Sequence, residues 1–294
     1  MTRVIAVFGP TAAGKTAAAV RLAHALGAEI VNCDAMQLYA GLPVLTNQPS
    51  EQERDGVPHH LLAVWPLGHE GSVVEYGRLA REAIAGIRSR GHDAVVVGGS
   101  GLYLRAALAP LDVPPQPRPG DRERFERLYD RDGAHAAHAL LERRDPRAAG
   151  VVHRNDRRRV VRALELTEIG ASLAPESSSL WAPAHGDSVV LGLEVASDEI
   201  RRRIAERTRS MFERGVEDEV REALGGPVSR TAARIHGLQD VAALLAGEID
   251  REEAIRRLDV RTRRYAKRQR AWMRRLPGLR PVAPDAVVPE RVAG

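Results

Sequence analysis

The stretch VIAVFGPTAAGKT, residues 4–16, decides the fold of this chain of 294 residues. An apolar, β-branched run at residues 4–8 leads into the pattern G-x-x-x-x-G-K-[ST] at residues 9–16, and a helix-like stretch follows. In such a loop the backbone N–H groups point into one concavity, and the start of the next helix adds partial positive charge. The stretch therefore predicts a strand, a phosphate loop and a helix at the edge of an α/β sheet.

All eight residues of this phosphate loop (residues 9–16) are candidate ligands of the phosphate groups: Gly9, Pro10, Thr11, Ala12, Ala13, Gly14, Lys15 and Thr16. The Lys15 ammonium is expected to reach the outer phosphates, and the Thr16 hydroxyl is a candidate ligand of Mg²⁺. Unrelated chemistries share this pattern, so the loop predicts a bound phosphate without identifying the molecule that carries it.

Short β-branched runs recur at residues 29–33, 94–98 and 188–195, and helical patterns lie at residues 15–26 and 74–90. Strands that alternate with helices are typical of a parallel sheet with crossover helices. We therefore expect an α/β fold of the P-loop NTPase-like type, in which helices flank a parallel sheet.

Two turn-rich loops interrupt this alternation and enclose a charged, alanine-rich helical block. The pattern predicts an all-helical domain at residues 113–186, inserted into an α/β core of residues 1–112 and 187–282 with basic C-terminal helices. Residues 283–294 are expected to form a loose tail. The alternative is that residues 113–186 are a long surface excursion of a single domain.

Polar side chains follow two other predicted strands. Asp34 comes directly after the run at residues 29–33, and Ser100 stands in the glycine-rich turn GGSG at residues 98–101. The carboxyl ends of parallel strands share one edge of the sheet, so we expect both side chains near the phosphate loop. There Asp34 could act as a general base or bind magnesium through water, although a carboxylate at such a place also caps helices.

The charge is uneven along the chain, whose formal net charge is +5. Residues 201–275 hold 20 Lys and Arg against 12 Asp and Glu, which predicts either a nucleic-acid partner or solvated helices rich in ion pairs. Only Lys15 and Lys267 are lysines. The single cysteine excludes an internal disulfide, and the lack of an apolar run of membrane-spanning length indicates a cytoplasmic protein without a membrane partner.

Seven stretches, in family order along nearly the whole chain, resemble the bacterial tRNA dimethylallyltransferases, also called tRNA isopentenyltransferases. They are GPTAAGKT (9–16), DAMQLYAGL (34–42), PHHLL (58–62), VGGSGLYLRA (97–106), HRNDRRRVVRALEL (153–166), RIAERTRSMFERGVEDEV (203–220) and RRYAKRQRAWMRR (263–275). The resemblance implies that the loop holds dimethylallyl diphosphate with Mg²⁺. It also implies transfer of the dimethylallyl group to the exocyclic amine of the adenosine on the 3′ side of a tRNA anticodon. We expect a monomer.

The resemblance implies roles by motif position. Asp34 is implied as the base that accepts a proton from the amine, and Arg207 as an arginine that reaches the diphosphate, with Arg203 as its companion. Ser100, where the family usually has threonine, is implied to orient Asp34 or the diphosphate. The adenosine must be flipped out, and the insertion at 113–186 is implied to help bind the tRNA. Further contacts to tRNA are implied for Gln37, Arg159, Arg162, Lys267, Arg268 and Gln269.

Two departures from the family pattern concern the acceptor. Ala35 stands where the family usually has serine, and Gln48 where it usually has lysine, within GLPVLTNQP (41–49). This segment also resembles the plant adenylate isopentenyltransferases, which act on free nucleotides and are the first alternative. A small-molecule P-loop kinase and a non-catalytic RNA-binding protein are the others. The pair His59 and His60 is interpreted as structural or pocket-lining rather than as metal ligands.

Overall fold

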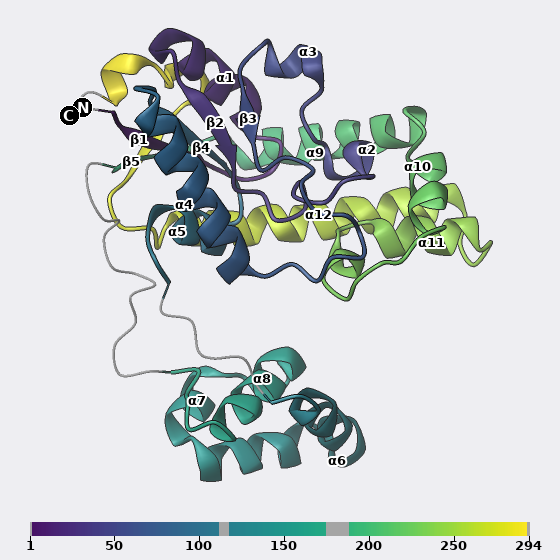
Figure 1. Cartoon of the computed structure of the whole chain (residues 1–294). Coiled ribbons are helices and arrows are strands. Elements are labelled where there is room, and N and C mark those ends of the chain that lie inside the picture. Colours follow the sequence, from purple (N-terminus) through teal and green to yellow (C-terminus); the bar gives the residue numbers. More distant parts are fainter. Residues whose placement is uncertain (1, 112–117, 175–187, 293–294) are drawn as a thin grey trace. The chain divides into compact units, whose positions relative to one another are not determined.

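The computed structural model describes residues 2–111, 118–174 and 188–292. The chain divides into two compact units, one of Met1–Leu111 with Trp181–Gly294 and one of Asp112–Leu180. The first unit contains the sheet and the second is helical (Figure 1). None of the helices described combines the length and the apolar character needed to span a bilayer.

The first unit is built on a six-stranded parallel sheet in the order β3-β2-β4-β1-β5-β6. The strands are β1 (Val4–Phe8), β2 (Glu29–Asn32), β3 (His59–His60), β4 (Ala94–Gly98), β5 (Ser188–Leu193) and β6 (Leu279–Val282). Phe8 at the end of β1 pairs with Gly98 of β4 and Gly192 of β5. The loops after β1, β2 and β4 therefore open at one edge of the sheet, and the prediction of a parallel α/β sheet is confirmed.

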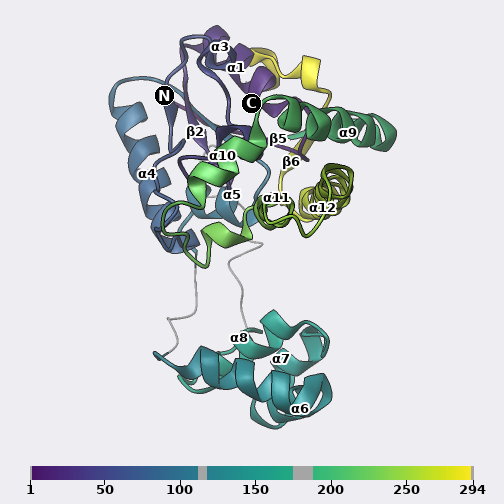
Figure 2. The ribbon, with the colours of Figure 1, turned by 90° about the vertical axis from the view of Figure 1, so that its right-hand side faces the viewer.

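Helices cover both faces of the sheet. The helices of this unit are α1 (Lys15–Leu26), α2 (Pro43–Thr46), α3 (Glu51–Arg54), α4 (Val73–Ser89), α5 (Gly101–Leu108), α9 (Ser197–Glu213), α10 (Val216–Ala223), α11 (Leu238–Leu245) and α12 (Arg251–Met273). Strand side chains alternate between two apolar clusters, so that Ile5 and Val7 pack with α1 and α9, and Ala6 and Phe8 with α4 and α5. Helices α9 and α12 lie side by side (Figure 2).

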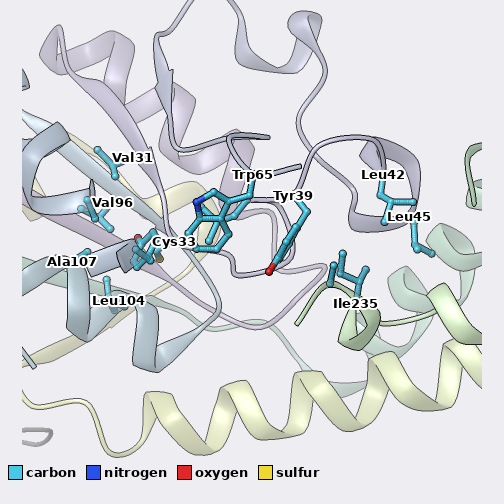
Figure 3. Packing of buried hydrophobic residues seen from close by; sticks show 14 of the residues in the cluster. Val31, Cys33, Tyr39, Leu42, Leu45, Trp65, Val96, Leu104, Ala107 and Ile235 are labelled. Carbon is cyan, nitrogen blue, oxygen red and sulfur yellow. The ribbon is translucent and has the colours of Figure 1, made fainter. Parts of the chain in front are cut away.

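An aromatic pair extends the core beyond the sheet. The rings of Tyr39 and Trp65 meet edge to face, with centroids 5.5 Å apart, and Figure 3 shows them between Cys33 and Ile235. The Tyr39 hydroxyl lies 2.8 Å from the Thr231 hydroxyl. This packing fixes the segment that follows β2, which carries Asp34.

The C-terminal segment differs from the prediction, because residues 283–292 are not a loose tail. They follow β6 as two short 3-10 turns, Pro284–Ala286 and Pro289–Arg291. Val287 and Val292 are buried in the cluster that contains α1. Two apolar side chains at this spacing are enough to anchor the segment to the sheet unit.

The second unit has an apolar core of its own. Its helices are α6 (Asp121–Arg144), α7 (Pro146–Val151) and α8 (Arg157–Thr167), and α6 is interrupted at Gly133, whose φ is 83°. Phe125, Leu141, Val160 and Leu164 are buried together in this core. The unit therefore buries its apolar side chains among its own helices.

Candidate active site

A cavity of about 360 Å³ opens where β1, β2 and β4 end. Its walls come from the phosphate loop, the segment between β2 and β3, and α9. The residues that line it are Thr11, Ala12, Gly14, Lys15, Thr16, Ala17, Asn32, Asp34, Gln37, Thr46, Asn47, Pro49, Glu53, His59, Leu62, Val97, Gly98, Arg203 and Arg207. Gly9, Pro10 and Ala13 of the predicted set are buried behind this wall. The cavity thus brings together residues that lie up to 196 positions apart.

The phosphate loop has the backbone that its pattern predicts. Ala12 and Gly14 adopt positive φ values of 64° and 83°, and Gly14 is the N-cap of α1. The first backbone N–H groups of a helix have no acceptor within the helix. At the start of α1 they belong to Lys15 and Thr16, which line the cavity, so the loop offers open donors to an anion.

Lys15 is half-buried and lines this cavity. Its ammonium donates to the Pro10 carbonyl, with Nζ and O 2.9 Å apart. Burial lowers the pKa of Lys15 to about 8, although the Asp34 carboxylate raises it and the Arg207 guanidinium lowers it further. The ammonium is therefore a poorly solvated positive charge beside an open space.

Helix α9 supplies a second, half-buried cation. Arg207 donates from Nη2 to the Thr11 hydroxyl at 2.6 Å, and its Nε has no hydrogen-bond partner among the described residues. Burial lowers the pKa of Arg207. Leaving a buried polar group unpaired costs about 1–3 kcal/mol. Two half-buried cations at one cavity make an arrangement that an anion would stabilise.

Arg203, one turn earlier on α9, holds the loop rather than lying free. Its Nη1 donates to the Ala12 carbonyl at 3.3 Å, and its Nε lies 2.6 Å from the Glu199 carboxylate. Arg203 also lines the cavity. The predicted companion of Arg207 is therefore present at the loop, with part of its charge compensated by Glu199.

Asp34 is half-buried and forms a tight turn after β2. Its backbone N–H donates to the Asn32 side-chain oxygen at 3.0 Å, and its own Oδ1 accepts from the Met36 N–H at 3.0 Å. The carboxylate therefore caps the local turn and still lines the cavity. Both interpretations of Asp34, structural and chemical, are compatible with this geometry.

Ser100 lies outside the cavity wall. Its Oγ accepts from the Ala35 N–H at 3.4 Å and lies 3.1 Å from the Tyr265 hydroxyl. Ser100 therefore holds the backbone of the residue that follows Asp34. The missing serine at position 35 leaves this backbone contact intact, because it uses the N–H of Ala35.

Gln37 and Gln48 hold the segment between β2 and β3, which forms part of the cavity wall. The Gln37 side-chain amide donates to the carbonyls of Thr46 and Asn47, at 3.3 and 2.7 Å. Gln48, which departs from the family pattern, donates to the Tyr39 carbonyl at 2.7 Å. Gln48 thus stabilises the segment between β2 and β3 through this hydrogen bond and does not line the cavity.

The predicted tRNA contacts on α12 do not share one face. Lys267 and Arg268 are exposed, whereas Gln269 is only 2% exposed. Successive residues of a helix are about 100° apart, so Lys267 and Gln269 point in nearly opposite directions. The Gln269 side chain accepts a hydrogen bond from the Thr11 N–H at 2.8 Å. The prediction that Gln269 contacts tRNA is therefore wrong for this structure, because its side chain is buried against the phosphate loop.

Arg159 and Arg162 belong to α8 of the second unit. Asp156 caps this helix through the Arg159 N–H at 3.1 Å, and Arg162 lies 3.1 Å from the buried Glu165 carboxylate. Both arginines are half-buried. Arg162 thus has a structural role in the helix, while the Arg159 side chain has none that the described contacts reveal.

The two histidines of β3 make different contacts. His59 contacts the Val57 carbonyl and lines the cavity, whereas His60 lies 2.7 Å from the Glu29 carboxylate. Within the described ranges no group of three or more His, Cys, Asp or Glu residues is placed to hold a metal ion. The sequence interpretation of His59 and His60 agrees with these contacts.

Tyr265 is a residue of the site region that sequence reasoning missed. It reaches Ser100 from α12, and its ring meets His236 edge to face with centroids 4.6 Å apart. The sequence does contain a pattern that could have indicated Tyr265: residues 265, 269 and 272 are spaced so that they lie on one face of a helix. Without the structure that face has no known partner.

The family is decided by a match over most of the chain. The family model for IPP transferase matches residues 37–276. The chain belongs to this family. A tRNA dimethylallyltransferase of Streptomyces coelicolor is 46% identical over 280 residues, which cover 94% of this chain and 88% of the relative. One of Acidothermus cellulolyticus is 43% identical, with 93% and 86% covered.

Solved structures agree with this family assignment. The full-length tRNA isopentenylpyrophosphate transferase of Bacillus halodurans superposes with a TM-score of 0.72 at 31% identity, over 99% of this chain and 93% of that one. A eukaryotic dimethylallyltransferase acting on tRNA has a TM-score of 0.73 at 24% identity, over 96% and 74% of the two chains, and shares the fold. The P-loop-like sheet with helices on both faces is therefore shared with solved structures of the IPP transferase family.

Proposed function

We propose that this chain transfers the dimethylallyl group of dimethylallyl diphosphate to the exocyclic amine of the adenosine 3′-adjacent to the anticodon in tRNA. The observation that carries the proposal is one cavity lined by two half-buried cations, Lys15 and Arg207, and by a carboxylate, Asp34. The cations suit a diphosphate, and the carboxylate suits an amine that must lose a proton. The relatives described above are named for tRNA, and none of them supports free adenosine nucleotides as the acceptor.

The chemistry assigns one task to each group. The amine nitrogen forms a bond to the allylic carbon, the bond from that carbon to the diphosphate oxygen breaks, and Asp34 takes the proton that the amine loses. Lys15, Arg207 and the loop N–H groups stabilise the negative charge that develops on the departing diphosphate. The products are isopentenyladenosine in tRNA and diphosphate.

Magnesium fits the donors that this cavity offers. Mg²⁺ prefers oxygen ligands and keeps several waters when it binds phosphate groups. In a phosphate loop of this pattern, the Ser or Thr hydroxyl is one of its ligands. Thr16 lines the cavity beside Lys15 and would hold the ion together with diphosphate oxygens. The bound ion would supply further neutralisation of the diphosphate charge.

The affinity for diphosphate is expected to fall as pH rises through about 8. The pKa of Lys15 is lowered to about 8, so above that pH the free protein loses the ammonium that an anion needs. The dissociation constant of Mg²⁺-diphosphate, measured by calorimetry between pH 6.5 and 9.5, should then rise by up to about tenfold per pH unit.

Lys15→Arg is the matched control for this pH dependence, because a guanidinium keeps its charge over the whole range. Its affinity relative to the wild-type protein should improve as pH rises, since titration of the ligand affects both proteins equally. A constant ratio between the two proteins would show that Lys15 does not titrate in this range.

The tRNA is expected to contact the outer face of α12. The arginines in the first turns of α9 are paired with carboxylates, as in Arg202 with Glu199 and Glu206. Lys267, in contrast, makes no ion pair among the described residues and lines a groove of about 470 Å³ between α9 and α12. The interpretation of the basic region as ion-paired helices thus applies to the first turns of α9. The interpretation as a surface for a polyanion fits the last turns of α12.

Lys267→Ala is expected to weaken tRNA binding and to reduce the slope of log affinity against log salt by about 0.7–0.9, the value for one phosphate contact. Filter binding of an anticodon stem-loop across a salt series measures the slope. Arg78→Ala, which removes an exposed cation from α4, is the matched control and should leave the slope unchanged. An unchanged slope in Lys267→Ala would remove this residue from the interface.

One assay separates the proposed acceptor from its alternatives. Purified protein is incubated with Mg²⁺ and radiolabelled dimethylallyl diphosphate, and with either unmodified tRNA or AMP. Label in tRNA alone is the expected result, whereas label in AMP would identify an adenylate isopentenyltransferase. Label in neither would contradict prenyl transfer and favour a kinase or a binding protein. The predicted monomer, the cytoplasmic location and a role of residues 113–186 in tRNA binding stay predictions.

A further inference from the structure

One face of α12 packs against the loops that follow β1 and β4. The residues of this face, Tyr265, Gln269 and Trp272, are spaced by four and three positions, as expected for one side of a helix. Tyr265 lies 3.1 Å from Ser100 Oγ, and the Trp272 ring lies 2.4 Å from the point where Gly101 would carry a Cβ. Between them, Gln269 reaches the phosphate loop.

Gln269 is buried and only half of its amide is satisfied. Its Oε1 accepts from the Thr11 N–H at 2.8 Å, while its Nε2 has no partner among the described residues. The side chain is 2% exposed. A buried amide with an unpaired donor is costly, and each such group in a native protein calls for an explanation. Packing alone would be served better by an apolar side chain such as methionine.

The position of this amide explains the glycine at residue 99. A Cβ on Gly99 would lie 2.0 Å from Gln269 Nε2 and 2.9 Å from the Gly9 carbonyl oxygen. Side-chain carbon atoms cannot approach so closely, so residue 99 must be glycine for the amide to sit between the two loops. The Gln269 amide thus occupies the space that a side chain at position 99 would need.

The contact also decides which way Thr11 faces. With its N–H bound to Gln269 and its hydroxyl bound to Arg207 Nη2 at 2.6 Å, Thr11 is held from two sides. Its N–H therefore cannot contribute to an anion in the cavity. The open donors come from the next turn of the loop, at Gly14, Lys15 and Thr16, whose direction depends on where the first turn is fixed.

We infer that Gln269 is a positioning residue of the diphosphate site: it holds Thr11 so that the rest of the phosphate loop presents its donors to the ligand. Gln269 and Thr11 are 258 residues apart in the sequence. The conformation of the N-terminal phosphate loop therefore depends on a contact from the C-terminal helix α12. That the bound diphosphate belongs to dimethylallyl diphosphate rests on the proposed function. That Gln269 affects the binding of diphosphate rests on the geometry alone.

Gln269→Met tests the inference, because methionine has a similar length and shape but accepts no hydrogen bond from Thr11. Calorimetry with inorganic diphosphate and Mg²⁺ is expected to show affinity reduced by about tenfold, the upper part of the range for the loss of one neutral hydrogen bond. In prenylation assays the KM for dimethylallyl diphosphate should rise by a similar factor, while kcat stays within about threefold and tRNA affinity within about twofold.

Thr262→Val is the matched control, since Thr262 is buried on the same face of α12 two turns earlier and is 8% exposed. It removes a polar group without touching the loop and should bind diphosphate like the wild-type protein. Gly99→Ala is the second variant, because its methyl group displaces the Gln269 amide from the other side. It should reproduce the weak diphosphate binding of Gln269→Met.

Thermal melting without ligand establishes that each variant is folded. Diphosphate affinity within about twofold of the wild-type value in a folded Gln269→Met or Gly99→Ala protein would overturn the inference. A wild-type protein that binds diphosphate but prenylates no tRNA would contradict the proposed function alone. The two failures are therefore distinguishable.

Discussion

Asp34→Asn is expected to lower the single-turnover rate of tRNA prenylation by about 10²- to 10⁴-fold, the range typical of the loss of a general base. Asparagine keeps an oxygen that can accept from the Met36 N–H, so the turn after β2 is retained. It cannot take the proton from the attacking amine. The affinities for diphosphate and for tRNA should both stay within about threefold of the wild-type values.

Glu53→Gln is the matched control for Asp34→Asn. Glu53 is the other carboxylate that lines the cavity, and it also accepts from the backbone N–H of the N-cap residue Ser50. Glutamine can keep that capping box, so only the charge is lost. A normal rate in Glu53→Gln and a strongly reduced rate in Asp34→Asn would assign the proton transfer to Asp34. Equal rates in all three proteins would leave Asp34 with its structural role only.

The parts of the site that sequence could predict are those written in local patterns. The run at residues 4–16 predicts a strand, a loop and a helix from neighbouring residues alone. The β-branched residues form the strand, and Gly14 takes the positive φ of the N-cap before the helix begins at Lys15. Asp34 could be placed beside this loop because parallel strands end at one edge of a sheet. Both inferences use spacing within a few residues and one general rule of topology.

The parts that sequence could not predict depend on distant contacts. β3 is only two residues long, and β6 is a four-residue edge strand with Pro281, so neither has a periodic signal. Gln269 stands in a basic segment, and its neighbours Lys267 and Arg268 are exposed, which favoured an RNA contact. Only the packing of α12 against the phosphate loop shows that Gln269 faces inward.

Replacing residues 113–186 by a short Gly/Ser linker is expected to leave diphosphate binding within about threefold of the full chain and to lower kcat/KM for tRNA by about 100-fold or more. The apolar clusters of the two units are separate, so the deletion does not open the core around the sheet. The cavity residues all lie outside the deleted segment. Calorimetry with diphosphate and steady-state prenylation of an anticodon stem-loop measure the two effects.

Arg159→Ala refines this deletion within an intact chain. Arg162→Ala is less informative, because it would remove a partner of the Glu165 carboxylate, which is 0% exposed, and would destabilise α8. The Arg159 side chain has no such partner in the described contacts, so a loss of tRNA affinity in Arg159→Ala would report binding rather than folding. If the deletion variant prenylates tRNA as well as the full chain, the second unit does not take part in recognition. Specificity would then reside in the cavity wall around Gln37 and on the outer face of α12.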